Sequence, residues 1–465
     1  MEHLDVGVVG TGYVGLATGA SLAYIGHRVT CLDNNQERVA GLKVGRVPFY
    51  EPGVEELIAK CAGRLRFAGS EGLTEVVRGS DILILAVGTP QGGDGSADLS
   101  NVADVARAIG RALGHSTPPR ELPLVVVNKS TVPVGSAYYV STLVDDGIDE
   151  AGGEGTEFRV ASNPEFLREG SAVHDSLFPD RVVVGTDSRE ALDALRALYT
   201  PIVEQSFPTE WDPRPKVAVP FVTTDLVSAE MIKYASNAFL ATKISFINEV
   251  ANLCELVGAD VGEVAYGIGL DERIGPRFLS AGIGWGGSCF PKDVAALRAV
   301  AREYDYEPVL LDAAVVVNAR QRKRVISKLQ RELHTLKGKR IALLGLAFKP
   351  NTDDLREAPS LTIARSLDSL GARVVGYDPV AGKKAAARRL LPSSTMKVVF
   401  DPYEALEGAH AAVIVTEWEE FRELDLERAA ALMEEPKVLV DGRNVVEPEA
   451  ALEAGLLYSG FGRRG

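Results

Sequence analysis

The stretch Val6-Gly-Val-Val-Gly10-Thr-Gly12-Tyr-Val-Gly15 joins a short β-branched segment to a turn that contains three glycines. The small residues at 16–25 are compatible with a helix, and Val29-Thr-Cys-Leu-Asp33 reads as a second strand that ends in a carboxylate. Glycines at this spacing allow a tight turn and a close approach of a pyrophosphate to a helix N-terminus, and the acid can bind ribose hydroxyls. The pattern predicts a dinucleotide-binding Rossmann-like domain. Asp33 would repel a 2′-phosphate, which favours NAD over NADP.

Further apolar runs at 81–87 and 124–128 are nearly continuous, as in strands of buried parallel sheets. Each run ends in turn residues, which include Thr89 after the first and Thr131 after the second. These turns fall at the carboxyl ends of strands, where open α/β sheets bind ligands. A short run at 182–185 is expected to be the last strand of this segment, and 206–224 is expected to be a linker or loop.

The pattern of strand, glycine turn, helix and strand begins again near residue 339. This second copy lacks the three-glycine turn, so it is expected to bind a different nucleotide or the substrate. Lys349, Arg356 and Arg443 follow predicted strands, where a diphosphate would be met. We therefore predict an α/β protein with two Rossmann-like doubly wound domains, at 1–210 and 331–465, joined by a central helical domain at 211–330.

The central segment contains one long predicted helix over 228–257. Lys233 and Asn237 lie one turn apart on it and share a face. Aligned polar side chains on a mostly apolar helix either satisfy one another in a core or line a site, and an inward lysine favours a site because burying it unpaired is costly. A helix with several apolar faces is also suited to joining two subunits.

Downstream, Gly284-Trp-Gly-Gly-Ser-Cys289-Phe-Pro-Lys292-Asp293 holds a cysteine among glycines and a proline. The other three cysteines lie in apolar periodic stretches, where a thiol usually packs as a small hydrophobe. Cys289 could pack in the same way, but Lys292 and Asp293 bring charges that can tune a thiolate. Asp293 is equally suited to cap a helix that begins near residue 294. Glu165 and Glu169, four residues apart in 163–170, would by themselves fit a solvated surface.

Composition narrows the class of protein. A chain of 465 residues suggests two or three domains. A formal net charge of −14 disfavours nucleic acid as a partner. No apolar run reaches the ~20 residues of a membrane span, and the first residues do not resemble a signal peptide. Four cysteines without paired spacing argue against a disulfide framework and a zinc site, so a reducing, cytoplasmic location is expected.

Four further motifs occur in order, at 129–135, 163–170, 233–243 and 286–293. Together with the glycine turn, they resemble the UDP-glucose/GDP-mannose dehydrogenase family over nearly the whole chain, from Gly10 to Arg443. The Phe-Pro-Lys-Asp ending of the last motif is similar to that of the UDP-glucose branch. The stretch at 211–219 departs from the family pattern because it is longer than expected.

The resemblance implies a four-electron oxidation of the sugar C6 alcohol of UDP-glucose to a carboxylate, with two NAD used in turn. Cys289 would form a thiohemiacetal and then a thioester. Glu165, helped by Thr131, would activate the hydrolytic water. Lys233 and Asn237 would stabilise the oxyanion, and Asp293 with Lys233 would hold a water or base.

The resemblance also implies the binding residues. The cofactor contacts are Gly10, Gly12, Tyr13, Val14, Gly15, Asp33, Thr89, Thr131, Glu169, Lys292 and Arg356. The substrate contacts are Glu165, Phe166, Leu167, Lys233, Asn237, Arg273, Phe278, Gly284, Phe348, Lys349 and Arg443. Arg273 is expected to reach in from a partner subunit of a homodimer or larger homo-oligomer formed through the long helix. The alternatives are the same chemistry on GDP-mannose or an N-acetylated UDP-hexosamine, and a nucleotide-sugar sensor without turnover.

Overall fold

The computed structural model describes residues 3–61, 63–93, 95–115, 122–153, 157–211, 218–387 and 396–463. The chain forms two compact units. We call Met1–Ala235 with Ala295–Val300 the first unit, and Ser236–Val294 with Ala301–Gly465 the second unit. The boundary runs through the long helix α9 (Leu226–Val257), and residues 212–217 of the long stretch at 211–219 lie outside the described residues. The division into three domains remains a prediction.

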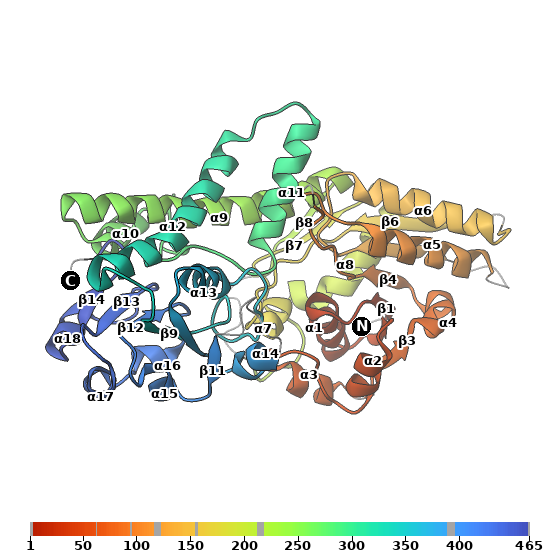
Figure 1. Cartoon of the computed structure of the whole chain (residues 1–465). Helices are drawn as coiled ribbons and strands as arrows, with labels where there is room; N and C mark the ends of the chain where they lie inside the picture. Colours follow the sequence, from red (N-terminus) through yellow and green to blue (C-terminus); the bar gives the residue numbers. More distant parts are fainter. Residues whose placement is uncertain are drawn as a thin grey trace. The chain divides into compact units, whose positions relative to one another are not determined.

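The first unit is built on an eight-stranded sheet with the order β3-β2-β1-β4-β5-β6-β7-β8 (Figure 1). Neighbouring strands are parallel, except that β6 and β7 are antiparallel. The order reverses between β1 and β4, which is the point where open α/β sheets bind ligands. The strands are β1 (Asp5–Val9), β2 (Arg28–Asp33), β3 (Leu65–Gly69), β4 (Ile82–Leu85), β5 (Leu124–Asn128), β6 (Phe158–Ser162), β7 (Val182–Gly185) and β8 (Phe221–Thr224).

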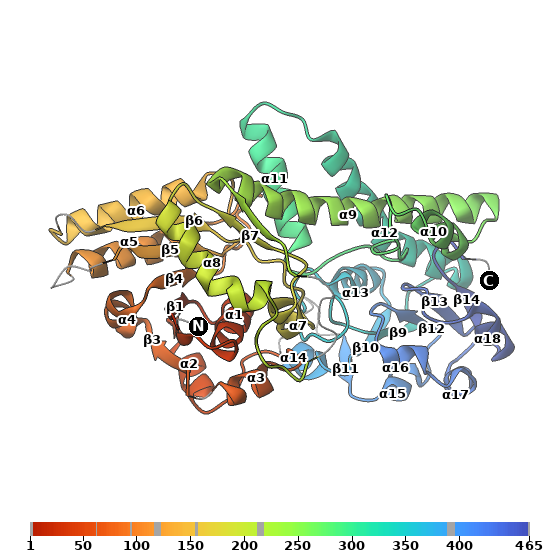
Figure 2. The same ribbon diagram turned by 180° about the vertical axis from the view of Figure 1, so that it is seen from behind.

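Helices cover both faces of this sheet, because successive strand residues point to opposite sides. Val125 and Val127 of β5 pack in the core that includes α1 and α8, whereas Leu124 and Val126 pack in the core that includes α5 and α6. Both views show α5 and α6 side by side (Figure 2). The helices are α1 (Tyr13–Tyr24), α2 (Gln36–Lys43), α3 (Val54–Lys60), α4 (Leu73–Gly79), α5 (Ser100–Gly114), α6 (Ser136–Glu150), α7 (Ala172–Leu177) and α8 (Arg189–Val203).

The second unit contains a six-stranded parallel sheet with the order β11-β10-β9-β12-β13-β14, which repeats the doubly wound arrangement. Its strands are β9 (Arg340–Leu344), β10 (Arg373–Tyr377), β11 (Lys397–Val399), β12 (Ala411–Ile414), β13 (Val438–Asp441) and β14 (Leu457–Ser459). The helices after α9 are α10 (Val261–Gly269), α11 (Phe290–Glu303), α12 (Val309–Leu333), α13 (Pro359–Ser369), α14 (Gly382–Ala387), α15 (Pro402–Leu406), α16 (Glu419–Arg422), α17 (Leu426–Leu432) and α18 (Pro448–Glu453).

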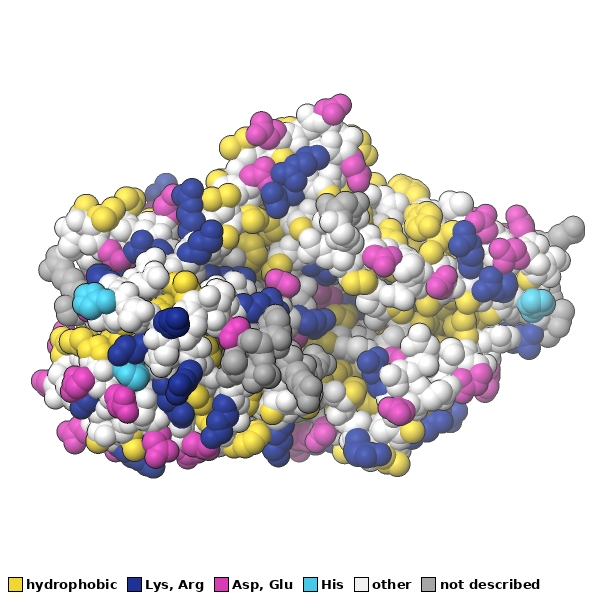
Figure 3. All heavy atoms as spheres, in the orientation of Figure 1, with side chains coloured by type: hydrophobic (Ala, Val, Ile, Leu, Met, Phe, Trp, Pro, Cys, Tyr) yellow, Lys and Arg dark blue, Asp and Glu magenta, His cyan; other side chains and the backbone are white. Residues whose placement is uncertain are grey.

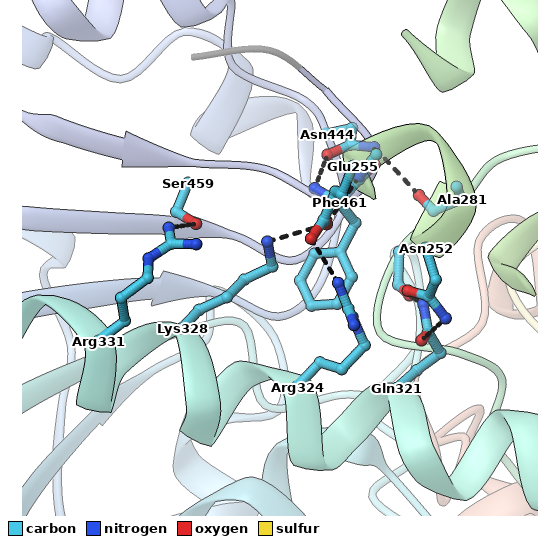
Figure 4. A network of polar contacts seen from close by, with 12 residues as sticks. Asn252, Glu255, Ala281, Gln321, Arg324, Lys328, Arg331, Asn444, Ser459 and Phe461 are labelled. Atoms are coloured by element: carbon cyan, nitrogen blue, oxygen red, sulfur yellow. Dashed lines mark hydrogen bonds and ion pairs between the residues drawn. The ribbon is translucent and has the colours of Figure 1, made fainter. Parts of the chain in front are cut away.

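A polar network in the second unit ties α9 to α12 and to the end of the described chain (Figure 4). Glu255 on α9 accepts hydrogen bonds from Arg324, from Lys328 Nζ at 2.9 Å and from the backbone N of Gly462 at 3.0 Å. The Lys328 ammonium also lies 5.1 Å from the centroid of the Phe461 ring. The network anchors the C-terminal segment on two helices far from it in sequence.

The expected fold class is confirmed, but several element boundaries were wrong. The strands β3, β6, β8, β11 and β14 were not expected, and because β8 follows β7, 182–185 is not the last strand of the first sheet. Strand β8 lies inside the stretch that was expected to be a loop, and its partly exposed edge position explains the weak apolar signal. Helix α11 begins at Phe290, with Pro291 in its first turn and Cys289 at the N-cap. Asp293 therefore lies inside the helix and does not cap it.

Basic and acidic side chains are interspersed over the face drawn in Figure 3, so the net charge of −14 does not gather there in a single patch. Among the described residues, no helix has both the length and the apolar character to cross a membrane.

Candidate functional site

The three glycines of the turn between β1 and α1 have different local environments. Gly10 adopts φ +100°, which disfavours other residues. A Cβ at Gly15 would lie 1.9 Å from the Gly10 carbonyl oxygen, so only glycine allows the helix to pack this close to the turn. A Cβ at Gly12 would have no heavy atom within 4 Å. The backbone is therefore open to a ligand at Gly12, and the turn fits the pyrophosphate of NAD.

Asp33 ends β2 with its carboxylate buried beside this turn. It accepts hydrogen bonds from Thr11 N at 2.8 Å, from Thr11 Oγ1 at 2.6 Å and from Arg38 at 2.9 Å. Burial raises the pKa of Asp33, but the hydrogen bonds from Thr11, Asn35 and Arg38 outweigh burial and lower the pKa overall. The lowered pKa favours the ionised carboxylate, whose oxygens can accept hydrogen bonds from ribose hydroxyls.

The other predicted cofactor residues of the first unit surround the ends of the central strands. Thr89 Oγ1 donates to the Thr131 carbonyl oxygen at 2.7 Å and so joins the turns after β4 and β5. Val14 is half-buried at the start of α1. The Tyr13 ring lies 5.9 Å from that of Phe49, and among the described residues its buried hydroxyl has no hydrogen-bond partner.

Glu165 and Lys233 form a buried ion pair in the first unit, although a glutamate in this loop would by itself fit a solvated surface. Glu165 Oε1 lies 2.9 Å from Lys233 Nζ, and both side chains are no more than 6% exposed. Lys233 Nζ also donates to the Glu165 carbonyl oxygen at 2.6 Å, and Glu165 Oε2 accepts from Leu167 N at 2.6 Å. The ring centroid of Phe166 lies 5.4 Å from the same ammonium. The loop with the predicted substrate residues Glu165, Phe166 and Leu167 therefore lies next to a fourth predicted substrate residue, Lys233 on α9.

Glu51 supports the same loop and was not among the predicted site residues. Its buried carboxylate accepts from the backbone N of Gly170 at 2.6 Å and of Ala172 at 2.7 Å. Glu169 is half-buried next to Gly170. Glu51 fixes the end of the loop from more than a hundred residues away, and a lone glutamate gives no sequence pattern that would have identified it.

In the second unit, Cys289 is exposed at the N-cap of α11, whereas Cys31, Cys61 and Cys254 are buried. A Cβ at Gly287, which adopts φ +85°, would lie 2.5 Å from the Phe348 ring. The glycine loop therefore packs directly against Phe348. The loop that carries the predicted thiol, Cys289, is therefore in contact with Phe348, one of the predicted substrate residues.

Asp293 is 1% exposed and accepts two hydrogen bonds of 2.6 Å, one from Lys292 Nζ and one from Asn237 Nδ2. Lys292 thus pairs with the carboxylate next to it. Asn237, one helical turn after Lys233 on α9, is oriented by Asp293. Because the amide nitrogen of Asn237 donates to Asp293, this hydrogen bond fixes the orientation of the side-chain amide.

The cations expected to bind a diphosphate have acidic or aromatic neighbours in the second unit. Arg443 lies 3.1 Å from Glu417 and donates to the Gly284 carbonyl oxygen at 3.2 Å, so it supports the cysteine loop. Arg356 pairs with Asp354 at 2.7 Å, and Lys349 Nζ lies 5.5 Å from the centroid of the Phe348 ring.

Two further predicted residues lie before the cysteine loop. Arg273 is 89% exposed and pairs with Asp271 at 2.6 Å. Phe278 adopts φ +65° and its ring centroid lies 6.4 Å from that of Phe290. Arg273 therefore contacts solvent within its own unit.

Polar side chains on α12 also hold the cysteine loop and were not predicted. Asn318 accepts from Trp285 N at 2.7 Å and donates to the Trp285 carbonyl oxygen at 3.0 Å. Arg322 donates to the same carbonyl at 2.9 Å, and Gln321 donates to Gly282 O at 3.0 Å. Asn318, Gln321 and Arg322 lie within about one turn of α12 and share a face of the helix. Polar residues at this spacing on a helix that packs on a core are a sequence signal that could have identified these three.

The predicted site residues thus form two sets, each with its own contacts. The first unit holds the glycine turn, Asp33, Thr89, Thr131, the loop with Glu165 and Lys233. The second unit holds Asn237, the cysteine loop, Lys292, Asp293 and the cations. Their catalytic and binding roles remain proposals.

The chain matches three models of the UDP-glucose/GDP-mannose dehydrogenase family, for its NAD binding domain over residues 4–203, its central domain over 227–320 and its UDP binding domain over 342–448. It is 45% identical to the UDP-glucose 6-dehydrogenase YwqF of Bacillus subtilis over 99% of this chain and 98% of the relative. A solved UDP-glucose dehydrogenase of Pyrobaculum islandicum is 39% identical, with a TM-score of 0.87 over 100% of this chain and 98% of the other. A solved UDP-D-ManNAc dehydrogenase of Pyrococcus horikoshii is 26% identical, with a TM-score of 0.81 over 98% and 99%.

Similarity at this level extends over both sheets, the long helix and the cysteine loop, and it agrees with a turn that fits NAD. The chain is an NAD-dependent oxidoreductase that belongs to the UDP-glucose/GDP-mannose dehydrogenase family.

Proposed function

We propose that this chain oxidises the C6 alcohol of UDP-glucose to the carboxylate of UDP-glucuronate in two successive oxidations. The observation that carries the proposal is the exposed Cys289 thiol at the N-cap of α11, in a loop whose glycines leave the backbone accessible. A simple alcohol dehydrogenase does not need a thiol. The names of the similar enzymes from B. subtilis and P. islandicum support UDP-glucose as the substrate.

The glycine turn and Asp33 would hold NAD, which would supply the hydride acceptor for each of the two oxidations. In the first oxidation, a water or base held by Asp293 and Lys233 takes the proton of the C6 hydroxyl. Cys289 Sγ then bonds to the aldehyde carbon, and its proton passes to the carbonyl oxygen to give a thiohemiacetal. Loss of a hydride and a proton from this adduct leaves a thioester on Cys289.

Hydrolysis completes the reaction. Glu165, helped by Thr131, removes a proton from water as the water oxygen bonds to the thioester carbon. Lys233 and the Asn237 amide, which Asp293 orients through a hydrogen bond of 2.6 Å, stabilise the oxyanion. The carbon–sulfur bond then breaks, and the thiol of Cys289 is regenerated.

The nucleotide part of the substrate is assigned to the second unit. Phe278, Gly284 and Phe348 would contact the sugar nucleotide, and Lys349 and Arg443 would meet its diphosphate. The packing of Gly287 on Phe348 and the bond from Arg443 to Gly284 support this assignment, because both link the nucleotide residues to the cysteine loop.

We also propose that the protein is a homodimer, or a larger homo-oligomer, formed through α9. Phe239, Phe246 and Leu253 are 54–69% exposed and recur every seven residues, which places them in one stripe along the helix. A second copy of the same stripe would cover it, and the exposed Arg273 would reach the partner. Sedimentation should give at least a dimer, and Phe246→Glu should yield a monomer. The buried cysteines and the use of NAD support a cytoplasmic location.

The proposal is tested by the yield of NADH per sugar when UDP-glucose is limiting, with GDP-mannose and a UDP-N-acetylhexosamine run in parallel. About two NADH per UDP-glucose, with little from the other sugars, are expected. One NADH per sugar would contradict the role of Cys289. Two from another sugar would retain the mechanism and change the substrate, and binding without NADH would indicate a sensor.

A further inference from the structure

Lys129 is a buried lysine directly after β5 that has no role in the assignments above. It is 7% exposed, and its Nζ donates to Asn163 Oδ1 at 3.0 Å and to Asn163 O and Tyr199 OH at 3.4 Å each. All three acceptors are uncharged. Among the described residues, no carboxylate lies within ion-pair distance of this ammonium. Since a buried ammonium without a carboxylate is costly, an apolar side chain would serve packing alone better.

Asn163, which holds Lys129, is the fixed starting point of the loop that carries Glu165. Its N donates to Asn128 O at 2.9 Å, and its Nδ2 donates to Val183 O at 2.7 Å. Its Oδ1 accepts from both Lys129 and Tyr199, the latter at 2.6 Å. Pro164 follows and restricts the backbone further. Lys129 therefore acts on a residue two positions before Glu165, in a loop with little freedom between them.

The charges around Lys129 belong to the proposed catalytic pair. Burial lowers the pKa of Lys129 to about 8, while Glu165 raises this pKa and Lys233 lowers it. Lys129 is therefore charged at neutral pH and is attracted to the same carboxylate that Lys233 binds at 2.9 Å. The ionisable groups that face it are Glu165 on its loop, Lys233 on α9 and Tyr199 on α8.

We propose that Lys129 is a positioning residue for Glu165, and that its ammonium, held by Asn163 and Tyr199, fixes the loop so that the carboxylate can activate the hydrolytic water. Its three hydrogen-bond acceptors belong to Asn163 and Tyr199, and neither residue is assigned to substrate or cofactor. Because this role rests on the proposed function of Glu165, it affects the hydrolysis of the thioester and not the two hydride transfers.

The direct test is Lys129→Met, which keeps an unbranched side chain one atom shorter and removes the charge. Glu165 should then be misplaced, and kcat should fall by about ten- to a hundredfold while KM for UDP-glucose changes little. The acyl group should accumulate on Cys289 as a mass adduct in protein quenched at steady state. Glu165→Gln is the positive control and should accumulate the same adduct. Wild-type kcat without an adduct in Lys129→Met would overturn the proposal.

A matched control is Lys328→Met in the second unit. Lys328 is also 7% exposed, and burial lowers its pKa, but it pairs with Glu255 in the network of Figure 4. This variant loses a buried lysine and should show no adduct. An adduct in Lys328→Met would mean that general destabilisation causes it, which would also overturn the proposal. If neither wild type nor Glu165→Gln uses Cys289, the proposed function itself fails, which is a separate outcome.

The pH dependence supplies a second measurement that does not require Lys129→Met to fold. A group with a lowered pKa of about 8 is charged below that pH and loses its charge above it. The rate of thioester hydrolysis in the wild type should therefore decline with a midpoint near pH 8. Tyr199→Phe removes an acceptor from the ammonium and should move this midpoint down by about half a unit. An unshifted midpoint in Tyr199→Phe would contradict the role of Lys129.

Discussion

Lys233→Met leaves the Glu165 carboxylate buried without the ammonium that lies 2.9 Å from its Oε1. Both side chains are no more than 6% exposed, so solvent cannot replace the lost partner. Removing one member of such a pair typically costs about 3–5 kcal/mol of unfolding free energy. Glu165→Gln keeps an oxygen for the ammonium and should cost less, about 1–3 kcal/mol.

The two changes should not add, because the glutamine no longer needs a cation. The double variant is expected to be more stable than the sum of the single effects by about 2 kcal/mol or more. Urea unfolding gives the free energy of unfolding of the wild type, the two single variants and the double variant. A background of Trp285→Phe and Trp418→Phe leaves Trp211, which lies in the first unit, as the fluorescent reporter of the unit that holds the pair.

The result that refutes this reasoning is additivity. If the double variant equals the sum of the single variants within about 0.5 kcal/mol, the two groups do not interact in the folded protein. A loss of less than about 1 kcal/mol in Lys233→Met would likewise mean that the carboxylate reaches water.

Further predictions concern a glycine, a thiol and a buried acid. Gly287→Ala should lower kcat/KM by about tenfold or more, because the new Cβ would lie 2.5 Å from the Phe348 ring. Gly338 has a similar φ of +77° and open space around it, so Gly338→Ala is a control that should introduce only backbone strain. Equal losses of activity in the two variants would refute the clash with Phe348. A thiol reagent should modify about one cysteine per native chain and none in Cys289→Ser, since the other three are buried; labelling of the Ser variant before unfolding would contradict this. Burial raises the pKa of Glu230 to about 7 despite its bonds to the N-terminus of α6, so the folded state binds its proton more tightly than the unfolded state. The stability of the wild type relative to Glu230→Gln should therefore be greatest below pH 4.5 and fall by about 3 kcal/mol as pH rises to 7, and a difference independent of pH would refute it.

Local pattern was sufficient for much of this fold. The turn from Val6 to Gly15 required glycines for reasons that depend on a few neighbouring atoms, so its strand, helix and ligand could be predicted. Strands with a continuous apolar run, such as β5, which is buried on both faces, were visible for the same reason. Short or edge strands such as β8 were missed, because partner strands and not their own residues stabilise them.

The site residues divide in the same way. Cys289 could be selected as a candidate from the glycines and the proline around it, and its role stays a prediction. Asp293 could not be assigned from sequence, since a helix N-cap and a buried acceptor look alike until α11 is seen to begin at Phe290. Glu51 gave no usable signal, and Lys129 lay in a recognised motif without an assigned role, because their partners at Gly170 and Asn163 meet them only in the folded chain. Sequence specifies which groups a site contains when their neighbours are local, whereas burial and pairing between distant segments arise only when the chain has folded.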